Sequence, residues 1–199
     1  MSLTAIKYDR GMGRWEPNAR GRLEQAAMSL YLESGFEQTT VAEIAKRAGL
    51  SERTFFRHFT DKREVLFWGA GALQDLLVGT IASAPTTATP IAAVLAGLEA
   101  GAALLQERRE GAVQRQSVIA ANAELQEREL IKLASLATAM ADALRQRGVK
   151  EPAASLTGEA GIVVFKVAFE RWINVTNEQD LVPLVRDSLK ELKGVTRDG

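Results

Sequence analysis

The sequence predicts an all-α protein, and three observations support that prediction. Apolar residues recur every three or four positions through nearly every long segment of the 199-residue chain, which is the spacing of helices. The 16 glycines and five prolines are sparse and clustered, and no internal repeat is visible. Alternating runs of Val, Ile and Thr that would indicate strands are missing. Residues 161–169 look strand-like, but their neighbours continue in helical period, so we assign them to a buried helix.

The composition excludes several kinds of site. The chain has no cysteine and one histidine, so disulfides, thiolate metal sites and cysteine nucleophiles are excluded, and neither a metal nor a cofactor is expected. No apolar run follows the basic residues near the N-terminus, and residues 90–105, the most membrane-like stretch, are short and interrupted by Glu99. We therefore expect a soluble, cytoplasmic protein that does not enter the membrane.

Positive charge is concentrated in one short segment. The whole chain has 25 acidic and 25 basic residues and no net charge, which argues against a general nucleic-acid coat. Residues 46–63, in contrast, carry only Glu52 and Asp61 as acidic side chains. The basic side chains of this segment are Lys46, Arg47, Arg53, Arg57, Lys62 and Arg63. A focused patch of this kind is what binding to DNA phosphates requires.

Two short helices are expected first. One covers residues 20–34 and ends at Gly35, because glycine suits the left-handed conformation of a helix C-cap. Thr40 and Glu43 have the spacing of a capping box, which opens the second helix, and Gly49 ends it.

The third expected helix begins after Ser51, a favourable N-cap residue, and it has two different faces. Phe55 and Phe59 lie four residues apart on the side toward the core. The opposite side carries Arg53, Phe56 and Arg57. One face is therefore built for packing, and the other is available for a partner.

Two short helices around a Gly-Leu turn, as in residues 41–59, are typical of a helix-turn-helix, whose second helix enters the major groove of DNA. Arginine pairs bidentately with guanine, and threonine contacts a base edge or a thymine methyl, so Arg53 and Thr54 are the expected base readers. Thr40 and Lys62 lie at helix N-termini, where backbone amides favour a phosphate oxygen.

The rest of the chain is expected to form one larger helical domain. Asp61 and Glu64 repeat the capping-box spacing, which predicts a long helix to residue 82 and then a linker at 85–89. Further helices are expected at residues 90–109, 112–121, 124–147, 157–176 and 181–193, with Gly148 and Gly194 among their end signals. The expected domains are a flexible arm (residues 1–19), a DNA-binding head (20–66) and a helical ligand-binding and dimerisation domain (67–199).

The N-terminal motifs resemble those of the TetR family of transcriptional regulators. The resemblance covers residues 20–68 and is carried by three runs at fixed spacing, TTVAEIA (39–45), AGLS (48–51) and RTFFRHFTDK (53–62). It implies a three-helix head joined by a fourth helix to a helical ligand domain. It also implies a homodimer through the helices at 157–176 and 181–193.

The same resemblance assigns DNA contacts to individual positions. Ser51, Arg53 and Thr54 fall near bases, and the phosphate-contacting positions are occupied by Thr40, Phe56, His58 and Lys62. The family often has tyrosine at the position of Phe56, which lacks the hydroxyl that could bond a phosphate and offers only packing or contact with a sugar or thymine methyl. Two interpretations of His58 stay open, a phosphate contact and packing between helices. Arg57 completes the outward basic face.

The ligand domain offers fewer signals. Phe165, Phe169 and Trp172 either line a cavity or simply fill a core. Arg115, Asn122 and Arg128 are expected to face inward, where an arginine would pair an acidic group of a ligand. Residues 13–17 and 53–59 also resemble actinobacterial members whose C-terminal domains look like acyl-CoA-responsive ones, which implies an acyl-CoA-like effector.

The resulting hypothesis is a sequence-specific repressor that leaves a pseudo-palindromic operator in double-stranded DNA when a small molecule binds, with activation as an open alternative. The rival hypothesis is an architectural DNA-binding protein without an effector. An enzyme is not expected, because no catalytic constellation and no glycine-rich phosphate loop is visible. Arg10 and Arg14 in the arm either enter the minor groove or have no role.

Overall fold

The computed structural model describes residues 18–174, 176 and 178–196. These residues form nine α-helices, one short 3-10 helix and no strand, so the all-α prediction is confirmed. The elements are α1 (Ala19–Ser34), α2 (Val41–Arg47), α3 (Glu52–His58), η1 (Glu64–Leu66), α4 (Ala70–Ser83), α5 (Pro90–Gln106), α6 (Arg109–Ala120), α7 (Ala123–Gln146), α8 (Ala153–Ile173) and α9 (Leu181–Val195).

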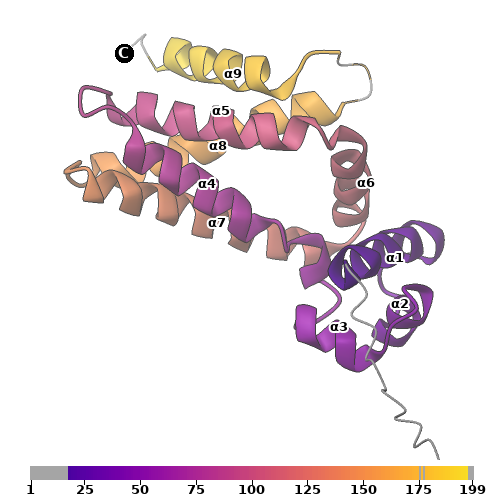
Figure 1. Cartoon of the computed structure of the whole chain (residues 1–199). Coiled ribbons are helices and arrows are strands. Elements are labelled where there is room, and N and C mark those ends of the chain that lie inside the picture. The colour runs from indigo at the N-terminus through magenta and orange to yellow at the C-terminus, as the bar shows by residue number, and fades with distance from the viewer. Residues whose placement is uncertain (1–17, 175, 177, 197–199) are drawn as a thin grey trace, which may run out of the picture.

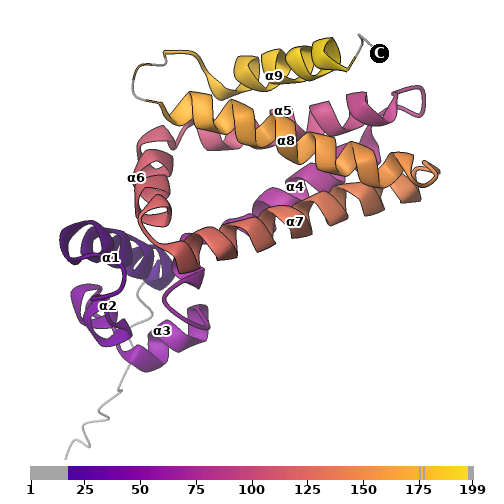
Figure 2. The same cartoon turned by 180° about the vertical axis from the view of Figure 1, so that it is seen from behind.

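The helices form two parts of unequal size. Helices α1 to α3 make a small head at one end of the molecule, and α4 to α9 make the larger body (Figure 1). The same division is visible from behind (Figure 2). The head has its own cluster of buried side chains, which includes Leu23, Ile44, Phe55 and Phe59. Each part therefore has a core that supports it.

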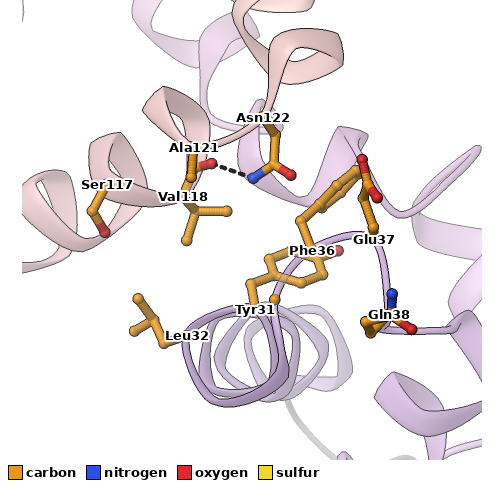
Figure 3. Close-up of a pocket in the computed structure, with 10 residues that line it drawn as sticks. Tyr31, Leu32, Phe36, Glu37, Gln38, Ser117, Val118, Ala121 and Asn122 are labelled. Atoms are coloured by element: carbon orange, nitrogen blue, oxygen red, sulfur yellow. Dashed lines mark hydrogen bonds between the residues drawn. The ribbon is translucent and has the colours of Figure 1, made fainter.

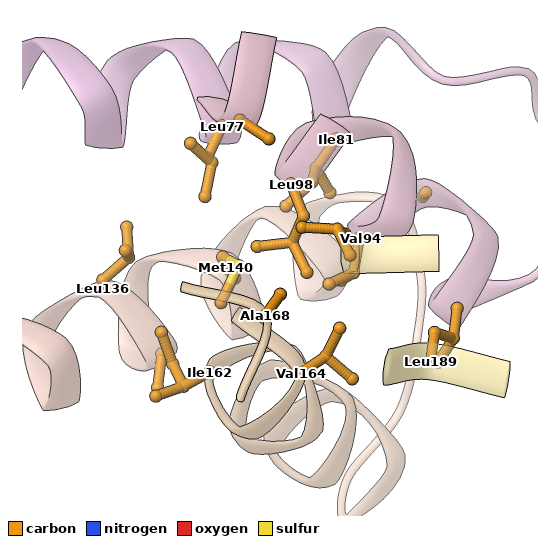
Figure 4. Close-up of a cluster of buried hydrophobic side chains, with 14 of the residues drawn as sticks. Leu77, Ile81, Val94, Leu98, Leu136, Met140, Ile162, Val164, Ala168 and Leu189 are labelled. Carbon is orange, nitrogen blue, oxygen red and sulfur yellow. The ribbon is translucent and has the colours of Figure 1, made fainter. Parts of the chain in front are cut away.

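The body is a bundle in which α8 packs against α7 and α9, and α5 packs against α4 and α9. Its core contains Leu77 and Ile81 of α4, Val94 of α5, Met140 of α7 and Val164 of α8 (Figure 4). One close approach depends on glycine, because a Cβ at Gly158 of α8 would lie 2.6 Å from a backbone oxygen of α7.

Helix α6 connects the two parts. It turns by 97° from the end of α5 and runs toward the head (Figure 1). Its last turn buries Val118 and Ile119 in the cluster of the head rather than in that of the body. The C-terminal end of α6 is therefore a direct contact between body and head.

The predicted single helix from residue 61 to 82 is wrong, because the chain forms η1 and then α4. Asp61 accepts hydrogen bonds from the backbone N–H of Arg63 (2.8 Å) and of Glu64 (3.2 Å), as a capping residue would. The helix does not continue, however, because Phe67 leaves the helical conformation and is buried in the cluster of the head.

The other helix boundaries differ less from the predicted ones. Helix α8 begins at Ala153, four residues earlier than expected, and ends at Ile173. Gly194 does not end α9, which continues to Val195, whereas Gly148 follows α7 with a positive φ of 86°. Asn18 caps α1 by accepting from the N–H of Gly21, so helix already begins at the end of the expected arm. Residues 1–17, with Arg10 and Arg14, lie outside the described residues.

By length and composition alone, one described segment, Glu64–Ser83, is long and apolar enough to span a membrane. Helix α5, which contains residues 90–105, reaches the same threshold only when it is taken together with α6. The segment Glu64–Ser83 comprises η1 and α4, and α4 packs against α5 and α7 within the bundle.

Candidate nucleic-acid interface

Helix α2 starts with the predicted capping box. The Thr40 hydroxyl oxygen accepts from the N–H of Glu43 at 3.2 Å, and the Glu43 carboxylate accepts from the N–H of Thr40 at 2.8 Å. The hydrogen bonds that the Glu43 carboxylate accepts from the N–H and from the hydroxyl of Thr40 lower the pKa of Glu43, because they favour its charged form. The box satisfies two free amides at the helix start and so defines where α2 begins. A phosphate contact by Thr40 stays a prediction.

The turn between α2 and α3 is held from outside the motif. Gly49 has a φ of 65°, which suits glycine, and the N–H of Leu50 donates to the carbonyl of Ala45 at 2.8 Å. The Arg22 guanidinium of α1 donates to the carbonyls of Ala48 (3.0 Å) and Gly49 (3.2 Å). Sequence reasoning missed Arg22, because nothing in a helical pattern indicates that a half-buried arginine reaches a turn 26 residues away.

Helix α3 has the two faces that the sequence predicts. Phe55 is fully buried, and its ring centroid lies 5.4 Å from that of Phe59. Arg53, Phe56 and Arg57 are exposed on the other side, and Phe56 is 54 % exposed. Because the inner face anchors the helix, the outer face can meet DNA without rearrangement of the head.

Two polar residues at the start of α3 contact each other. Ser51 caps the helix by accepting from the N–H of Thr54 at 3.2 Å, and the two hydroxyls lie 3.0 Å apart. The Thr54 hydroxyl therefore shares one hydrogen bond with Ser51, and both its remaining hydrogen-bonding capacity and its methyl group can contact a base. Base contacts by Ser51, Arg53 and Thr54 stay predictions.

His58 lies at the end of α3 and is half-buried. Its Nε2 is buried without a hydrogen-bond partner among the described residues. Burial lowers the pKa of His58, and the neighbouring charges of Arg57 and Arg20 lower it further. The imidazole is therefore neutral near pH 7. The unpartnered nitrogen leaves both packing and a phosphate contact open.

Lys62 lies just before η1, at the start of the helical segment after α3, but its side chain is engaged within the protein. It was expected at the N-terminus of the next helix, but its ammonium donates to the carbonyls of Phe36 (2.8 Å), Glu37 (3.1 Å) and Thr39 (2.9 Å). Its own carbonyl accepts from the Tyr31 hydroxyl at 2.6 Å. An ammonium has three N–H donors, so in this structure Lys62 uses all of them to join the segment after α3 to the loop between α1 and α2, and a phosphate contact by Lys62 stays a prediction.

The basic segment is therefore divided between two tasks. Arg47 forms an ion pair with Glu33 at 2.8 Å, and Arg63 pairs with Asp61 and Glu124. The exposed basic residues of the segment without an ion pair in the described part of the chain are Lys46, Arg53 and Arg57. The positive surface that remains for DNA lies on α2 and α3.

The predicted ligand residues fall into two separate groups. Phe165 and Phe169 of α8 have ring centroids 5.7 Å apart, and the same distance separates Phe169 from Trp172. Trp172 is only 1 % exposed and belongs to the core of the body. These aromatic side chains pack against one another inside the bundle.

Arg115, Asn122 and Arg128 do not join these aromatic residues. Arg115 donates to the carbonyl of Leu66 (2.7 Å), and Arg128 donates to the Glu64 carboxylate (2.7 Å), so both contact η1. The Asn122 amide donates to the carbonyl of Val118 at 2.7 Å. The expectation of one shared, inward-facing ligand set is therefore corrected, because protein partners at the junction of head and body occupy these three side chains.

Comparison with known proteins gives matches in the head. The family model described as bacterial regulatory proteins, tetR family, matches residues 24–67. The HTH-type transcriptional regulator TcmR of Streptomyces glaucescens is 35 % identical over 75 residues, which cover 38 % of this chain and 33 % of TcmR. The match thus spans one third of the length of that relative.

Solved structures resemble the chain over both parts. The fatty acid degradation regulator FadR from Bacillus halodurans has a TM-score of 0.62 at 19 % identity, with 92 % of this chain and 98 % of that chain covered. FadR from Bacillus subtilis in complex with stearoyl-CoA has a TM-score of 0.61 at 21 % identity, with 86 % and 96 % covered. The head therefore matches the tetR family of bacterial regulatory proteins, and the two parts together share the fold of the two FadR structures.

Proposed function

We propose that the protein is a cytoplasmic, homodimeric repressor that binds a pseudo-palindromic DNA operator and leaves it when a small-molecule effector binds the body. The observation that carries this proposal is the outer face of α3. It presents Arg53, Phe56 and Arg57 to solvent on a head whose internal contacts use Arg22 and Lys62. A preorganised helix of this kind fits the major groove.

Dimerisation through α8 and α9 is supported by an apolar stripe on α8. Leu156, Val163 and Val167 follow one another at intervals of seven and four residues and are 65, 51 and 43 % exposed. Large apolar side chains in one line on a surface are typical of an interface. A dimer would place two copies of α3 on one side of the molecule, as a two-fold operator requires.

The effector is proposed to be acyl-CoA-like. The similar FadR structure from Bacillus subtilis holds stearoyl-CoA. In this chain α4 is strongly apolar, yet Leu73, Leu76 and Val78 are only partly buried, so part of its surface remains for an apolar chain. Binding there would change the equilibrium between head positions only if the effector prefers one of them.

The first test is selection of bound duplexes from a random pool at fixed salt, with wild-type protein beside Arg53→Ala. We expect the wild-type protein to select an inverted repeat. Arg53→Ala should lose about 1–3 kcal/mol of the binding free energy that distinguishes the preferred base pair from the others at one position of each half-site. Lys150→Ala is the control, because it removes an exposed positive charge from the α7–α8 loop of the body. Binding that is indifferent to sequence and to Arg53 would favour the architectural alternative.

Two further measurements test the remaining parts. Val163→Asp should shift sedimentation from dimer to monomer, because it places a charge in the apolar stripe. Stearoyl-CoA should raise the melting temperature and release the operator, since a ligand stabilises the state that it binds. A panel of acyl-CoA species that changes neither property would remove the proposed effector class.

A further inference from the structure

A groove of about 490 Å³ lies between the head and the body, where the ends of α1 and α6 meet (Figure 3). The head contributes Leu32, Phe36 and Glu37, and the body contributes Ser117 and Asn122. It is separate from the core aromatic residues of α8, which do not line it. A molecule in this groove would touch both parts of the protein.

The side-chain polar groups of Glu37, Ser117 and Asn122 offer hydrogen-bond acceptors to the groove, and the Gln38 amide, which also lines it, can both donate and accept. The Ser117 hydroxyl donates a hydrogen bond to the carbonyl of Gln114 at 2.7 Å, so only its lone pairs remain available, as acceptors. The Asn122 amide nitrogen donates to the carbonyl of Val118, and its carbonyl oxygen points away from that bond, on the side of Phe36 and Glu37 (Figure 3). The groove therefore suits a ligand that donates hydrogen bonds.

The groove also carries negative charge, which suits a positively charged ligand. Glu37 is exposed, and no ion pair engages it in the part of the chain that the structure describes. Helices α1 and α6 both end here, and the carboxyl end of a helix carries partial negative charge. Among the residues that the structure describes, no lysine or arginine lines the groove. The Lys62 ammonium contacts the same loop and keeps its positive charge, but it does not line the groove; it is engaged by three carbonyls and lies over the ring of Phe36.

The floor of the groove is apolar. Leu32 is 47 % exposed and supplies most of the accessible apolar surface, and Val118 of α6, which is 5 % exposed, borders it. Burial of this surface by a ligand would be favourable at about 25 cal/mol per Å². The site thus combines an apolar contact with acceptors and a carboxylate.

We propose that this groove binds a small organic cation, an ammonium or amidinium group carried on an apolar body. The cationic group pairs with Glu37 and the oxygen of Asn122, and the apolar body covers Leu32 and Val118. The binding itself is independent of the proposed repressor function. Its consequence rests on that function, because a ligand that joins α1 to α6 holds the head at one angle and changes DNA affinity.

The test is titration of phenylbutylammonium into the full-length protein without DNA, followed by amide and methyl NMR. We expect saturable shifts at the Asn122 side-chain amide and at the Leu32 methyl groups. Phenylbutanol has the same apolar body with a neutral end and should bind more weakly than the cation. Phenylbutyrate, whose end is negative, should bind most weakly of the three. Glu37→Gln should weaken the cation about threefold, as for an exposed ion pair.

Glu159→Gln is the matched control, because it removes an exposed carboxylate from α8, away from the groove. Ala121→Trp is a second variant, which should fill the groove and abolish the shifts while the fold, seen by circular dichroism, is retained. Equal binding of the three probes, or a Glu37→Gln variant that binds like the control, would overturn the proposal. Release of operator DNA by acyl-CoA is a separate readout, so a failure of the repressor proposal would leave this result interpretable.

Discussion

The two sides of the junction between head and body are built differently. On the side toward α7, the Glu64 carboxylate of η1 accepts from Arg128 at 2.7 Å and from Lys132 at 3.1 Å. Arg63 reaches Glu124 at 2.6 Å beside this pair. On the side toward the end of α6, apolar contacts border the open groove described above. Charged contacts therefore fasten one side, and the other side is left accessible.

Arg115 strengthens the fastened side from α6. Its guanidinium donates to the carbonyl of Leu66, pairs with Glu129 at 3.0 Å and lies 5.0 Å from the ring centroid of Phe67. Burial lowers the pKa of Arg115, while the charge of Glu129 opposes that effect. The segment from Arg63 to Phe67 is therefore held by side chains of both α6 and α7.

The largest effect is expected from Glu64→Gln. The Glu64 side chain is only 18 % exposed, and its loss leaves the positive charges of Arg128 and Lys132 close together without a carboxylate. We expect a loss of about 2 kcal/mol in the free energy of unfolding by urea. Glu127→Gln, an exposed neighbour on α7, is the control. A double-mutant cycle with Arg128→Gln that gives no coupling energy would contradict the claim that the Glu64–Arg128 ion pair holds the head to the body.

Arg115→Met should have the next largest effect. Methionine keeps much of the packing against Phe67, but the carbonyl of Leu66 and the carboxylate of Glu129 lose their donor. The expected cost is about 1.5 kcal/mol in the same urea experiment. Lys166→Met, an exposed site on α8, should change stability by much less. If both variants behaved alike, Arg115 would not hold η1.

On the open side, Asn122→Ala should cost little. It removes one hydrogen bond, from the side-chain amide to the carbonyl of Val118, at a partly exposed site. We expect about 0.5 kcal/mol, which is the lower end for a single neutral hydrogen bond. A loss as large as that of Glu64→Gln would mean that the two sides of the junction hold the head equally, which would contradict the comparison.

The smallest effect is a dependence on pH through Glu24 of α1, which contacts Trp68 beyond η1. Burial raises the pKa of Glu24 above its ordinary value of 4.5, although Arg20 and Arg108 oppose the shift. The folded state binds this proton more tightly, so the stabilisation is complete below the ordinary pKa and is lost as pH rises through the raised one. Glu24→Gln should therefore be slightly more stable than wild type at pH 7 and lose that advantage toward pH 4. A difference that is constant with pH would exclude this titration.

The sequence determined the head by itself to a large extent. Capping by Thr40 and Ser51, the glycine at position 49 and the two faces of α3 depend on residues within four positions of one another, and all of them appear in the structure. Local hydrogen bonds and side-chain periodicity decide such features before any tertiary contact forms.

Only the tertiary structure decided what the longer side chains do. Arg22, Lys62, Arg115 and Arg128 each bond to groups that lie 23 to 64 positions away, and no local pattern encodes a partner at that distance. A lysine or arginine at a given place is compatible with a DNA phosphate, a ligand or a backbone carbonyl, and the folded chain selects among them by what it brings within reach. The break between η1 and α4 has the same origin, because burial of Phe67 in the head outweighs the local preference for a continuous helix.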